Sequence, residues 1–376
     1  MKRIISLITA AVIMISSTVF TYADGGPEIT APSAILVEKT TGRVLYEKNP
    51  DEKMRPASVT KIMTILLIME AIENGQLNYN DTVTASAYAT SMGGSQVYLK
   101  ENEQMSVDDM LKCIVVASAN DACVAMAEHI AGSVDEFVIK MNERAQQLGM
   151  TNTSFKNCTG LEAEGHLTTA RDISMMSREL LKHDDIKKYT KIWMDSIRGG
   201  QFGLTNTNKL IRFYDKATGL KTGYTKESMY CISATAEDNG MELIAVIMAA
   251  PSSDERNADA KTLLNYGFSK YALYSADKQE LMPVKVIKGK AETVQPQMQQ
   301  MMNLLVEKGT EKDIKCEITL CEDVMAPVEK GQKLGEAKLV LNGEVLSSCN
   351  IEAQEEVPKA GVFDMFMAIL NYFLIL

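Results

Sequence analysis

Apolar residues recur along the chain with two different periods, and together these predict both helices and strands. In six segments they return every three or four positions, which is typical of helices that bury one face. Several of these segments end at a helix stop signal such as Asn74-Gly75 or Gly149. The predicted helices are residues 59–72, 107–117, 121–131, 134–148, 169–183 and 257–271.

Short apolar runs between turn residues predict strands. The predicted strands near the start and middle of the chain are residues 34–37, 43–46, 219–224, 229–236 and 243–249. Asp238-Asn239-Gly240 is a strong hairpin turn between the last two. A hairpin, a helical block, three antiparallel strands and a final helix describe one α+β unit that ends near Tyr274. Residues 282–358, with short strands and an Asn342-Gly343 turn, predict a second, smaller all-β domain.

The two ends of the chain carry apolar runs of a different kind. Lys2 and Arg3 precede the apolar run Ile4–Phe20, and Ala23 stands at a suitable cleavage position, so residues 1–23 are predicted to be a secretory signal peptide. An uncleaved membrane anchor is the alternative reading. Residues 361–376 are apolar almost throughout and carry one charge, Asp364. Because this segment is short for a full span, we expect a helix that lies on or partly in the membrane surface.

Composition narrows the classes of function that the chain can have. Hydrophobic residues make up 46% and charged residues 23%, as in ordinary globular proteins. A net charge of −10 and 6% aromatic residues argue against nucleic acid as a partner. Seven cysteines and three histidines show no metal-site spacing, so we predict no metal and no cofactor. Four of the cysteines are expected to be buried thiols: Cys113, Cys123, Cys158 and Cys231.

Ser58-Val59-Thr60-Lys61 lies at the start of the first predicted helix. Residues three apart share a helix face, so the Ser58 hydroxyl and the Lys61 amine can meet as nucleophile and base. The pKa of such a lysine must fall by roughly 3 units, which burial and a second nearby cation provide. We therefore expect another lysine close by. A helix cap beside a surface lysine is the alternative, and Ser275-Ala276-Asp277-Lys278 repeats the pattern by chance.

Two further motifs follow the first in the chain. Ser118-Ala119-Asn120 interrupts the helical pattern, where a hydroxyl and an amide two residues apart can face one cleft. Helix capping is the alternative interpretation of this motif. The same Ser-x-Asn pattern recurs at Ser348-Cys349-Asn350, where no Lys-Thr-Gly follows it. Lys221-Thr222-Gly223 lies within a strand and offers a cation, a hydroxyl and a glycine that admits a close backbone approach. The three motifs together are far more specific than each alone.

On these motifs the chain resembles the low-molecular-mass penicillin-binding proteins, which are serine-type D-alanyl-D-alanine carboxypeptidases. The resemblance extends over essentially the whole mature length. The stretches that carry it are Pro56-Ala57-Ser58-Val59-Thr60-Lys61, Ser118-Ala119-Asn120-Asp121-Ala122, His166-Leu167-Thr168-Thr169-Ala170-Arg171-Asp172 and Gly219-Leu220-Lys221-Thr222-Gly223-Tyr224-Thr225.

The resemblance implies an α+β transpeptidase domain of the penicillin-binding and β-lactamase type at residues 27–278. A small all-β domain at 280–358 and a membrane-anchoring amphipathic helix at 359–376 would follow. The implied reaction removes the terminal D-alanine from peptidoglycan stem peptides and is blocked by β-lactam antibiotics. The implied location is the extracytoplasmic face of the bacterial cell membrane.

The family's residue roles are carried over by position. Ser58 becomes the acylated nucleophile, Lys61 its general base and Ser118 a catalytic partner. The backbone N–H groups of Ser58 and Tyr224 would form the oxyanion hole, and Arg256 is a candidate for holding the terminal carboxylate. His166 is interpreted as structural. The substrate-binding residues implied are Asn120, Lys221, Thr222, Gly223, Tyr224, Thr225 and Arg256.

Two rival functions share these motifs. A β-lactamase would add a dedicated deacylating glutamate, which the sequence does not reveal, and would have no use for a β domain and an anchor. A catalytically idle wall-binding or scaffolding protein would keep the fold without the reaction.

Overall fold

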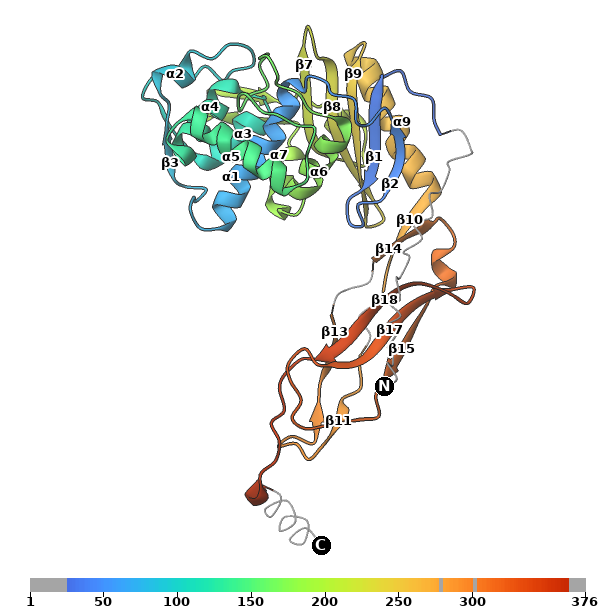
Figure 1. Ribbon diagram of the computed structural model, residues 1–376. Helices are drawn as coiled ribbons and strands as arrows, with labels where there is room; N and C mark the ends of the chain where they lie inside the picture. The colour runs from blue at the N-terminus through green and yellow to red at the C-terminus, as the bar shows by residue number, and fades with distance from the viewer. Residues whose placement is uncertain (1–25, 277–279, 300–302, 365–376) are drawn as a thin grey trace, which may run out of the picture.

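The computed structural model describes residues 26–276, 280–299 and 303–364. Figure 1 shows a larger body that combines a sheet with helices, and an elongated β body that extends from it. The fold class is therefore α+β, as the sequence predicts. The larger body contains all three sequence motifs.

A five-stranded antiparallel sheet forms the centre of the larger body, in the order β2-β1-β9-β8-β7. Its strands are β1 (Ser33–Glu38), β2 (Val44–Lys48), β7 (Ala217–Thr225), β8 (Met229–Asp238) and β9 (Met241–Ala250). All five predicted strands are confirmed. Asn239 and Gly240 have φ values of 48° and 77°, the left-handed conformation expected of their hairpin turn. The order leaves β7, with its Lys-Thr-Gly motif, at one edge of the sheet.

Both faces of this sheet are buried, because alternate residues of each strand enter separate cores. Ile35 and Val37 pack with the helical block, whereas Ala34 and Leu36 pack against α9 (Ser253–Lys270). Successive side chains of a strand point to opposite faces, which produces this division. In Figure 1, α9 lies on one side of the sheet and the helical block on the other.

The helical block confirms the predicted helices, with differences at their ends. Its main helices are the 3₁₀ turn η1 (Ala57–Thr60), α1 (Lys61–Glu73), α3 (Val107–Val115), α4 (Asn120–Ala131), α5 (Val134–Gln147) and α6 (Ala170–Leu180). The predicted end of α6 at His183 is wrong, since a separate 3₁₀ turn follows the helix. The predicted start of α9 at Asn257 is also wrong. Ser252 caps the helix earlier by accepting a hydrogen bond from the Glu255 N–H (3.1 Å).

Several short elements carry too few residues to show a period and were not predicted. They surround the helical block and the β7 edge of the sheet. They are β3 (Thr82–Thr84), α2 (Ala87–Thr90), β4 (Gln104–Ser106), η2 (Asp184–Ile186), α7 (Lys187–Thr190), β5 (Met194–Ile197), β6 (Phe202–Thr205) and α8 (Leu210–Phe213).

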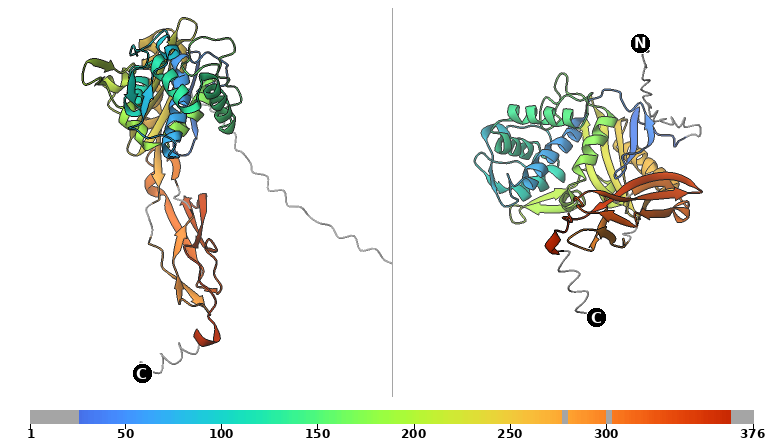
Figure 2. Two further views of the ribbon diagram at one scale, coloured as in Figure 1. Left: turned by 90° about the vertical axis from the view of Figure 1, so that its left-hand side faces the viewer. Right: turned by 60° about the horizontal axis from the view of Figure 1, so that its bottom comes forward.

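The elongated body consists mainly of strands, as predicted, and the left view of Figure 2 shows its narrow form. Its elements are β10 (Tyr271–Ser275), β11 (Val284–Ile287), β12 (Thr293–Val294), β13 (Pro296–Met298), β14 (Asn303–Glu307), η3 (Glu311–Asp313), β15 (Lys315–Leu320), β16 (Asp323–Met325), β17 (Lys333–Leu341) and β18 (Glu344–Ala353). The predicted turn at Asn342-Gly343 joins β17 to β18 and has positive φ at both residues.

The predicted signal peptide lies outside the described residues, as does most of the predicted C-terminal helix. Both stay predictions. Among the helices in residues 26–276, 280–299 and 303–364, none has the length and apolar character that crossing a bilayer requires.

Candidate active site

Ser58 lies in the turn η1, directly before the first residues of α1. Ala57, the residue before it, has a positive φ of 48°, so the backbone turns sharply as it enters the helix. The turn places Ser58 Oγ at 2.9 Å from Lys61 Nζ, where the amine donates to the hydroxyl oxygen. The meeting of hydroxyl and amine that the spacing predicts is present.

Lys61 is wholly buried, with an exposed fraction of 0%, although it is a lysine. Its Nζ donates to Asn120 Oδ1 (2.6 Å) and to the backbone carbonyl of Thr159 (2.8 Å), besides Ser58. Burial lowers the pKa of Lys61 below its usual value, because water no longer stabilises the ammonium form. An amine that is buried, contacts a hydroxyl and loses its proton more readily is suited to act as a base.

The break between α3 and α4 presents the second motif to Lys61. Ser118 has a positive φ of 61° and is 3% exposed, and its Oγ has no hydrogen-bond partner within the described part of the chain. An unpaired buried hydroxyl costs free energy, so this arrangement needs an explanation beyond the packing of the chain. Asn120 is fixed from its other side, since its Nδ2 donates to the Gly93 carbonyl (2.6 Å).

A buried carboxylate holds the loop that covers this break. Asp121 accepts hydrogen bonds from the backbone N–H groups of Val97 (3.2 Å) and Leu99 (3.0 Å). The Asn120 N–H donates to the Ser95 carbonyl (2.7 Å) in the same loop. This role of Asp121 could not be predicted from the sequence, because these partners are backbone groups more than twenty residues away.

β7 supplies the second lysine. Lys221 is 1% exposed, and its Nζ donates to the Thr222 carbonyl (3.0 Å). Burial lowers the pKa of Lys221 well below its usual value, and the positive charge of Lys61 lowers it further. The cation expected near Lys61 is therefore Lys221.

The glycine of the third motif permits β7 to lie against the nucleophile. A Cβ at Gly223 would lie 2.8 Å from the Pro56 carbonyl oxygen and 3.0 Å from the Ser58 nitrogen. Only glycine fits such an approach without moving the backbone. The close approach brings the backbone of β7 beside the Ser58 N–H, where two N–H groups can share one oxygen.

The other predicted residues of β7 contact neighbouring side chains. Thr222 Oγ1 donates to Thr207 Oγ1 (2.7 Å), and Thr225 Oγ1 is hydrogen-bonded to Ser228 Oγ (2.7 Å). Tyr224 is 54% exposed, and its ring stacks on Tyr230 with 4.3 Å between centroids.

Arg256 lies in the first turns of α9 and is 4% exposed, so it is not an ordinary surface arginine at a helix start. Its guanidinium donates to the side chains of Asn257 and Ser253, and no carboxylate in the described residues forms an ion pair with it. Burial lowers the pKa of Arg256 to about 10. Its charge reaches Lys221 and contributes to the lowered pKa of that lysine.

His166, interpreted as structural from the sequence, has a hydrogen-bond partner at each ring nitrogen. Its Nδ1 accepts from the Lys156 N–H (3.1 Å), so Nε2 carries the proton and donates to Thr60 Oγ1 (2.8 Å). Burial lowers the pKa of His166 to about 4, which keeps the ring neutral. The four cysteines predicted to be buried are buried and free.

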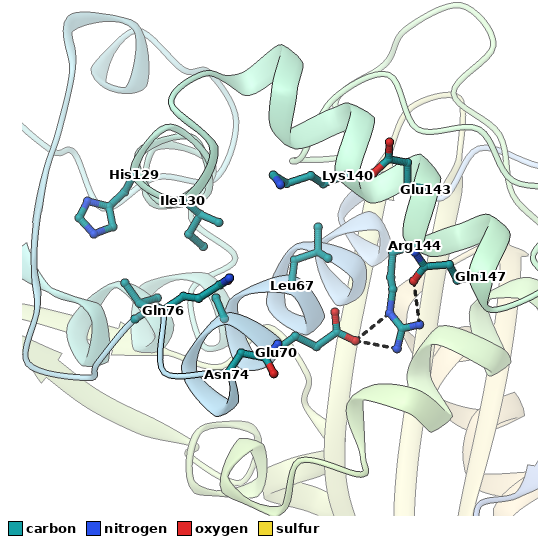
Figure 3. A pocket seen from close by; sticks show the side chains of 12 residues that line it. Leu67, Glu70, Asn74, Gln76, His129, Ile130, Lys140, Glu143, Arg144 and Gln147 are labelled. Carbon is teal, nitrogen blue, oxygen red and sulfur yellow. Dashed lines mark hydrogen bonds and ion pairs between the residues drawn. The ribbon is translucent and has the colours of Figure 1, made fainter.

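A separate cavity of about 430 Å³ is bordered by α1, the end of α4 and α5 (Figure 3). In it Arg144 reaches from α5 to the carboxylate of Glu70 on α1 (2.7 Å). The cavity contains none of the motif residues. Its lining is Leu67, Glu70, Ala71, Asn74, Gln76, Leu77, His129, Ile130, Lys140, Glu143, Arg144 and Gln147.

Two family models match the chain in succession. The model described as D-alanyl-D-alanine carboxypeptidase, peptidase S11, matches residues 20–252. The chain belongs to this family. The model described as the C-terminal domain of penicillin-binding protein 5 matches residues 268–359, which include most of the elongated β body.

Individual relatives agree with this assignment. The chain is 44% identical over 373 residues to the D-alanyl-D-alanine carboxypeptidase DacF of Bacillus subtilis, with 96% of each chain covered. The structure of penicillin-binding protein 5 from Haemophilus influenzae is similar, with a TM-score of 0.75 and 30% identity over 89% of this chain and 100% of that one. Penicillin-binding protein D2 of Listeria monocytogenes, in an ampicillin-bound form, has a TM-score of 0.59 and 29% identity, and 64% and 100% of the two chains are covered.

The protein is thus a serine-type D-alanyl-D-alanine carboxypeptidase, and this prediction from the sequence is confirmed. The two rival readings, a β-lactamase and an idle scaffold, find no support in these comparisons.

Proposed function

We propose that Ser58 is the residue that becomes acylated and that Lys61 is the base that activates it. The observation that carries this proposal is the 2.9 Å contact between Ser58 Oγ and a wholly buried Lys61 Nζ. Burial lowers the pKa of Lys61, which increases the share of neutral amine able to take the hydroxyl proton.

In the first step Ser58 Oγ attacks the carbonyl carbon between two terminal D-alanines. An Oγ–C bond forms, the C–N bond breaks, and the proton taken by Lys61 ends on the nitrogen of the departing D-alanine. The backbone N–H groups of Ser58 and Tyr224 stabilise the oxyanion, and each such donor is typically worth about 3 kcal/mol. The close approach that Gly223 permits supports this pairing of N–H groups.

In the second step a water molecule attacks the acyl-Ser58 ester and releases the shortened stem peptide. Ser118 and Lys221 pass protons between the water, the leaving groups and Lys61, and Asn120 holds both Lys61 and the substrate. The unpaired Ser118 hydroxyl and the lowered pKa of Lys221 support these roles.

The carboxylate at the end of the substrate binds near Thr222, Thr225 and Arg256. Arg256 is a buried cation without an ion-pair partner among the described residues, an arrangement that costs free energy unless a ligand supplies the anion. Penicillins carry a carboxylate beside a reactive amide and acylate Ser58 in place of the substrate. The ampicillin-bound form of the Listeria protein supports this extension.

The protein works outside the cytoplasm, at the outer face of the cell membrane. The apolar run that precedes Ala23 supports export, and the apolar run after Gly361 supports attachment at the membrane surface. The mature chain then consists of a peptidase domain at 27–278, a β domain at 280–358 and an anchoring helix at 359–376.

The test is the release of free D-alanine from a peptide that ends in D-alanyl-D-alanine. Protein lacking residues 1–23 should release it, and the Ser58→Ala variant should not. Release by Ser58→Ala at the wild-type rate would refute the assignment of the nucleophile, whereas hydrolysis of penicillin without D-alanine release would refute the proposed substrate.

A further inference from the structure

Lys61 has a third contact, the Thr159 carbonyl, which is a backbone group that no side-chain motif describes. The amine contacts the Ser58 hydroxyl (2.9 Å), the Asn120 amide oxygen (2.6 Å) and the Thr159 carbonyl oxygen (2.8 Å). These partners differ in what they can do. A carbonyl or amide oxygen only accepts a hydrogen bond, whereas a hydroxyl both accepts and donates.

This difference decides where the lone pair of a neutral Lys61 points. The protonated amine has three hydrogens and donates one to each partner. After it loses one proton, its two remaining hydrogens stay with Asn120 and Thr159, since neither of those oxygens can donate. The lone pair then faces the Ser58 hydroxyl, which is the geometry that proton transfer requires. The Thr159 carbonyl therefore helps to direct the lone pair of Lys61 toward the Ser58 hydroxyl.

One side chain holds this carbonyl in place. Asn157 Oδ1 accepts three hydrogen bonds, from the Thr159 N–H (3.1 Å), the Thr159 hydroxyl (3.1 Å) and the Gly160 N–H (2.7 Å). Asn157 Nδ2 donates to the Leu161 carbonyl (2.8 Å) and closes the loop. Because these hydrogen bonds all go to the Asn157 amide, the peptide group between Thr159 and Gly160 has little freedom to rotate.

The loop is also fitted tightly against the nucleophile's helix. Thr64 Oγ1 in α1 donates to the Cys158 carbonyl (2.6 Å). Gly160 has a φ of 84°, and a Cβ there would lie 1.8 Å from the Ala57 carbonyl oxygen, so no larger residue fits. The loop and the Ser58 turn are therefore positioned relative to each other by direct contact.

We propose that Asn157 is a positioning residue for the acylation step: it fixes the Thr159 carbonyl, which directs the Lys61 lone pair at the Ser58 hydroxyl. Asn157 itself contacts neither Lys61 nor the reacting atoms in the contacts described above. The proposal rests on the function proposed for Ser58 and Lys61.

The test compares acylation by a fluorescent penicillin across a pH range in the mature protein and its Asn157→Ala variant. Above the pKa of Lys61 the rate reaches a plateau that reports how well the neutral amine is aimed, independently of how much of it is neutral. We expect Asn157→Ala to lower that plateau by about tenfold to a hundredfold, as small misplacements of catalytic groups do. Rates are expressed per acylatable site, so that unfolded protein does not enter the comparison.

Asn142→Ala is the matched control. Asn142 anchors the same loop at Phe155 with hydrogen bonds to both its N–H (2.9 Å) and its carbonyl (3.0 Å), but it does not touch residues 157–161 in the described contacts. Asn142→Ala should lower the midpoint of thermal unfolding and leave the plateau of the acylation rate unchanged. Equal plateaus for Asn157→Ala and wild type, or equal losses in both variants, would overturn the proposal.

The Asn157→Asp variant provides a second test, which does not depend on whether the alanine variant folds. It keeps the oxygen that accepts the three hydrogen bonds, so it should keep most of the plateau, while its negative charge moves the rising limb to higher pH. A plateau lost in a folded Asn157→Asp variant would overturn the proposal. If the wild-type protein forms no adduct on Ser58, the function proposed above fails instead, which is a different result.

Discussion

At the scale of single residues, the site depends on charged and polar groups held where water cannot reach them. Lys61, Lys221 and Arg256 are each at most 4% exposed, and no described carboxylate forms an ion pair with any of them. Burial of an unpaired charge opposes folding, so these residues reduce stability in exchange for reactivity and binding. Their behaviour with pH and on substitution follows from this.

The pH dependence of acylation should report the lowered pKa of Lys61. Only the neutral amine takes the proton of Ser58, so the rate rises as pH increases through that pKa and falls at lower pH. Because burial lowers the pKa, the rise should come below the range of an ordinary lysine, about 10.4. Stopped-flow acylation by a chromogenic β-lactam measures it. A rise at the ordinary lysine pKa, or an active Lys61→Arg variant, would speak against Lys61 as base.

The Arg256→Met variant should show whether Arg256 serves substrate binding or the stability of the fold. Removal of the buried cation takes away the partner of the substrate carboxylate, so we expect KM for a D-alanyl-D-alanine peptide to rise about tenfold or more, corresponding to about 1.4 kcal/mol. The thermal midpoint should stay unchanged or rise, because an unpaired buried charge is lost. An unchanged KM with a lowered midpoint would show that Arg256 is structural.

The side chains of the site could be predicted from the sequence, whereas its backbone groups could not. The side chains that the structure brings together occur at recognisable spacings in the sequence. They are Ser58, Lys61, Asn120 and Lys221. The Thr159 carbonyl left no trace in the sequence, since every residue has a carbonyl and only the fold directs this one at Lys61. The burial of Arg256 was missed because its helix begins earlier than the apolar period suggests.

At the scale of elements, the site forms where the edge strand β7, the turn η1 and the break between α3 and α4 meet. The turn and the break have positive φ at Ala57 and Ser118, whereas β7 is regular there and has a glycine at position 223 that allows its close approach. A non-glycine residue with positive φ is strained, and such strain is typical of functional sites. The long helices and the central strands were predictable from their periods, whereas the short elements around the site were not, because three or four residues are too few to show that a period repeats.

The approach of β7 to η1 predicts the effect of one added methyl group. Gly223→Ala places a Cβ at 2.8 Å from the Pro56 carbonyl and pushes the strand away from Ser58. Acylation should fall by about two orders of magnitude, comparable with the loss of an oxyanion donor. Gly203→Ala in β6 is the control, because its Cβ would meet nothing within 4 Å. Similar acylation rates in both variants would contradict the role given to this contact.

At the scale of the whole molecule, the peptidase body and the β body are joined through strands and side chains near the end of α9. β10 pairs with β14, and Arg43 Nη1 donates to the Leu305 carbonyl (3.1 Å). Lys308 Nζ donates to the Phe268 carbonyl (3.0 Å) at the end of α9. The β body therefore continues directly from the peptidase body rather than hanging on a free linker, and Figure 1 shows it leading away from the sheet.

The proposed membrane attachment predicts a difference between two forms of the mature protein. Protein that retains residues 359–376 should co-sediment with phospholipid vesicles, and protein that ends at residue 358 should stay in the supernatant. Both should be acylated by penicillin at the same rate, because the site lies wholly within the larger body. Equal sedimentation of the two forms would show that the C-terminal segment is not the anchor.

The most direct test of the whole account is mass spectrometry of the protein after brief reaction with penicillin. Peptide mapping should find one adduct, an ester on Ser58, that is absent from Ser58→Ala and strongly reduced in Lys61→Arg. An adduct on another residue, or full labelling of Ser58→Ala, would contradict the assignment of Ser58 as nucleophile and with it the mechanism built on Lys61.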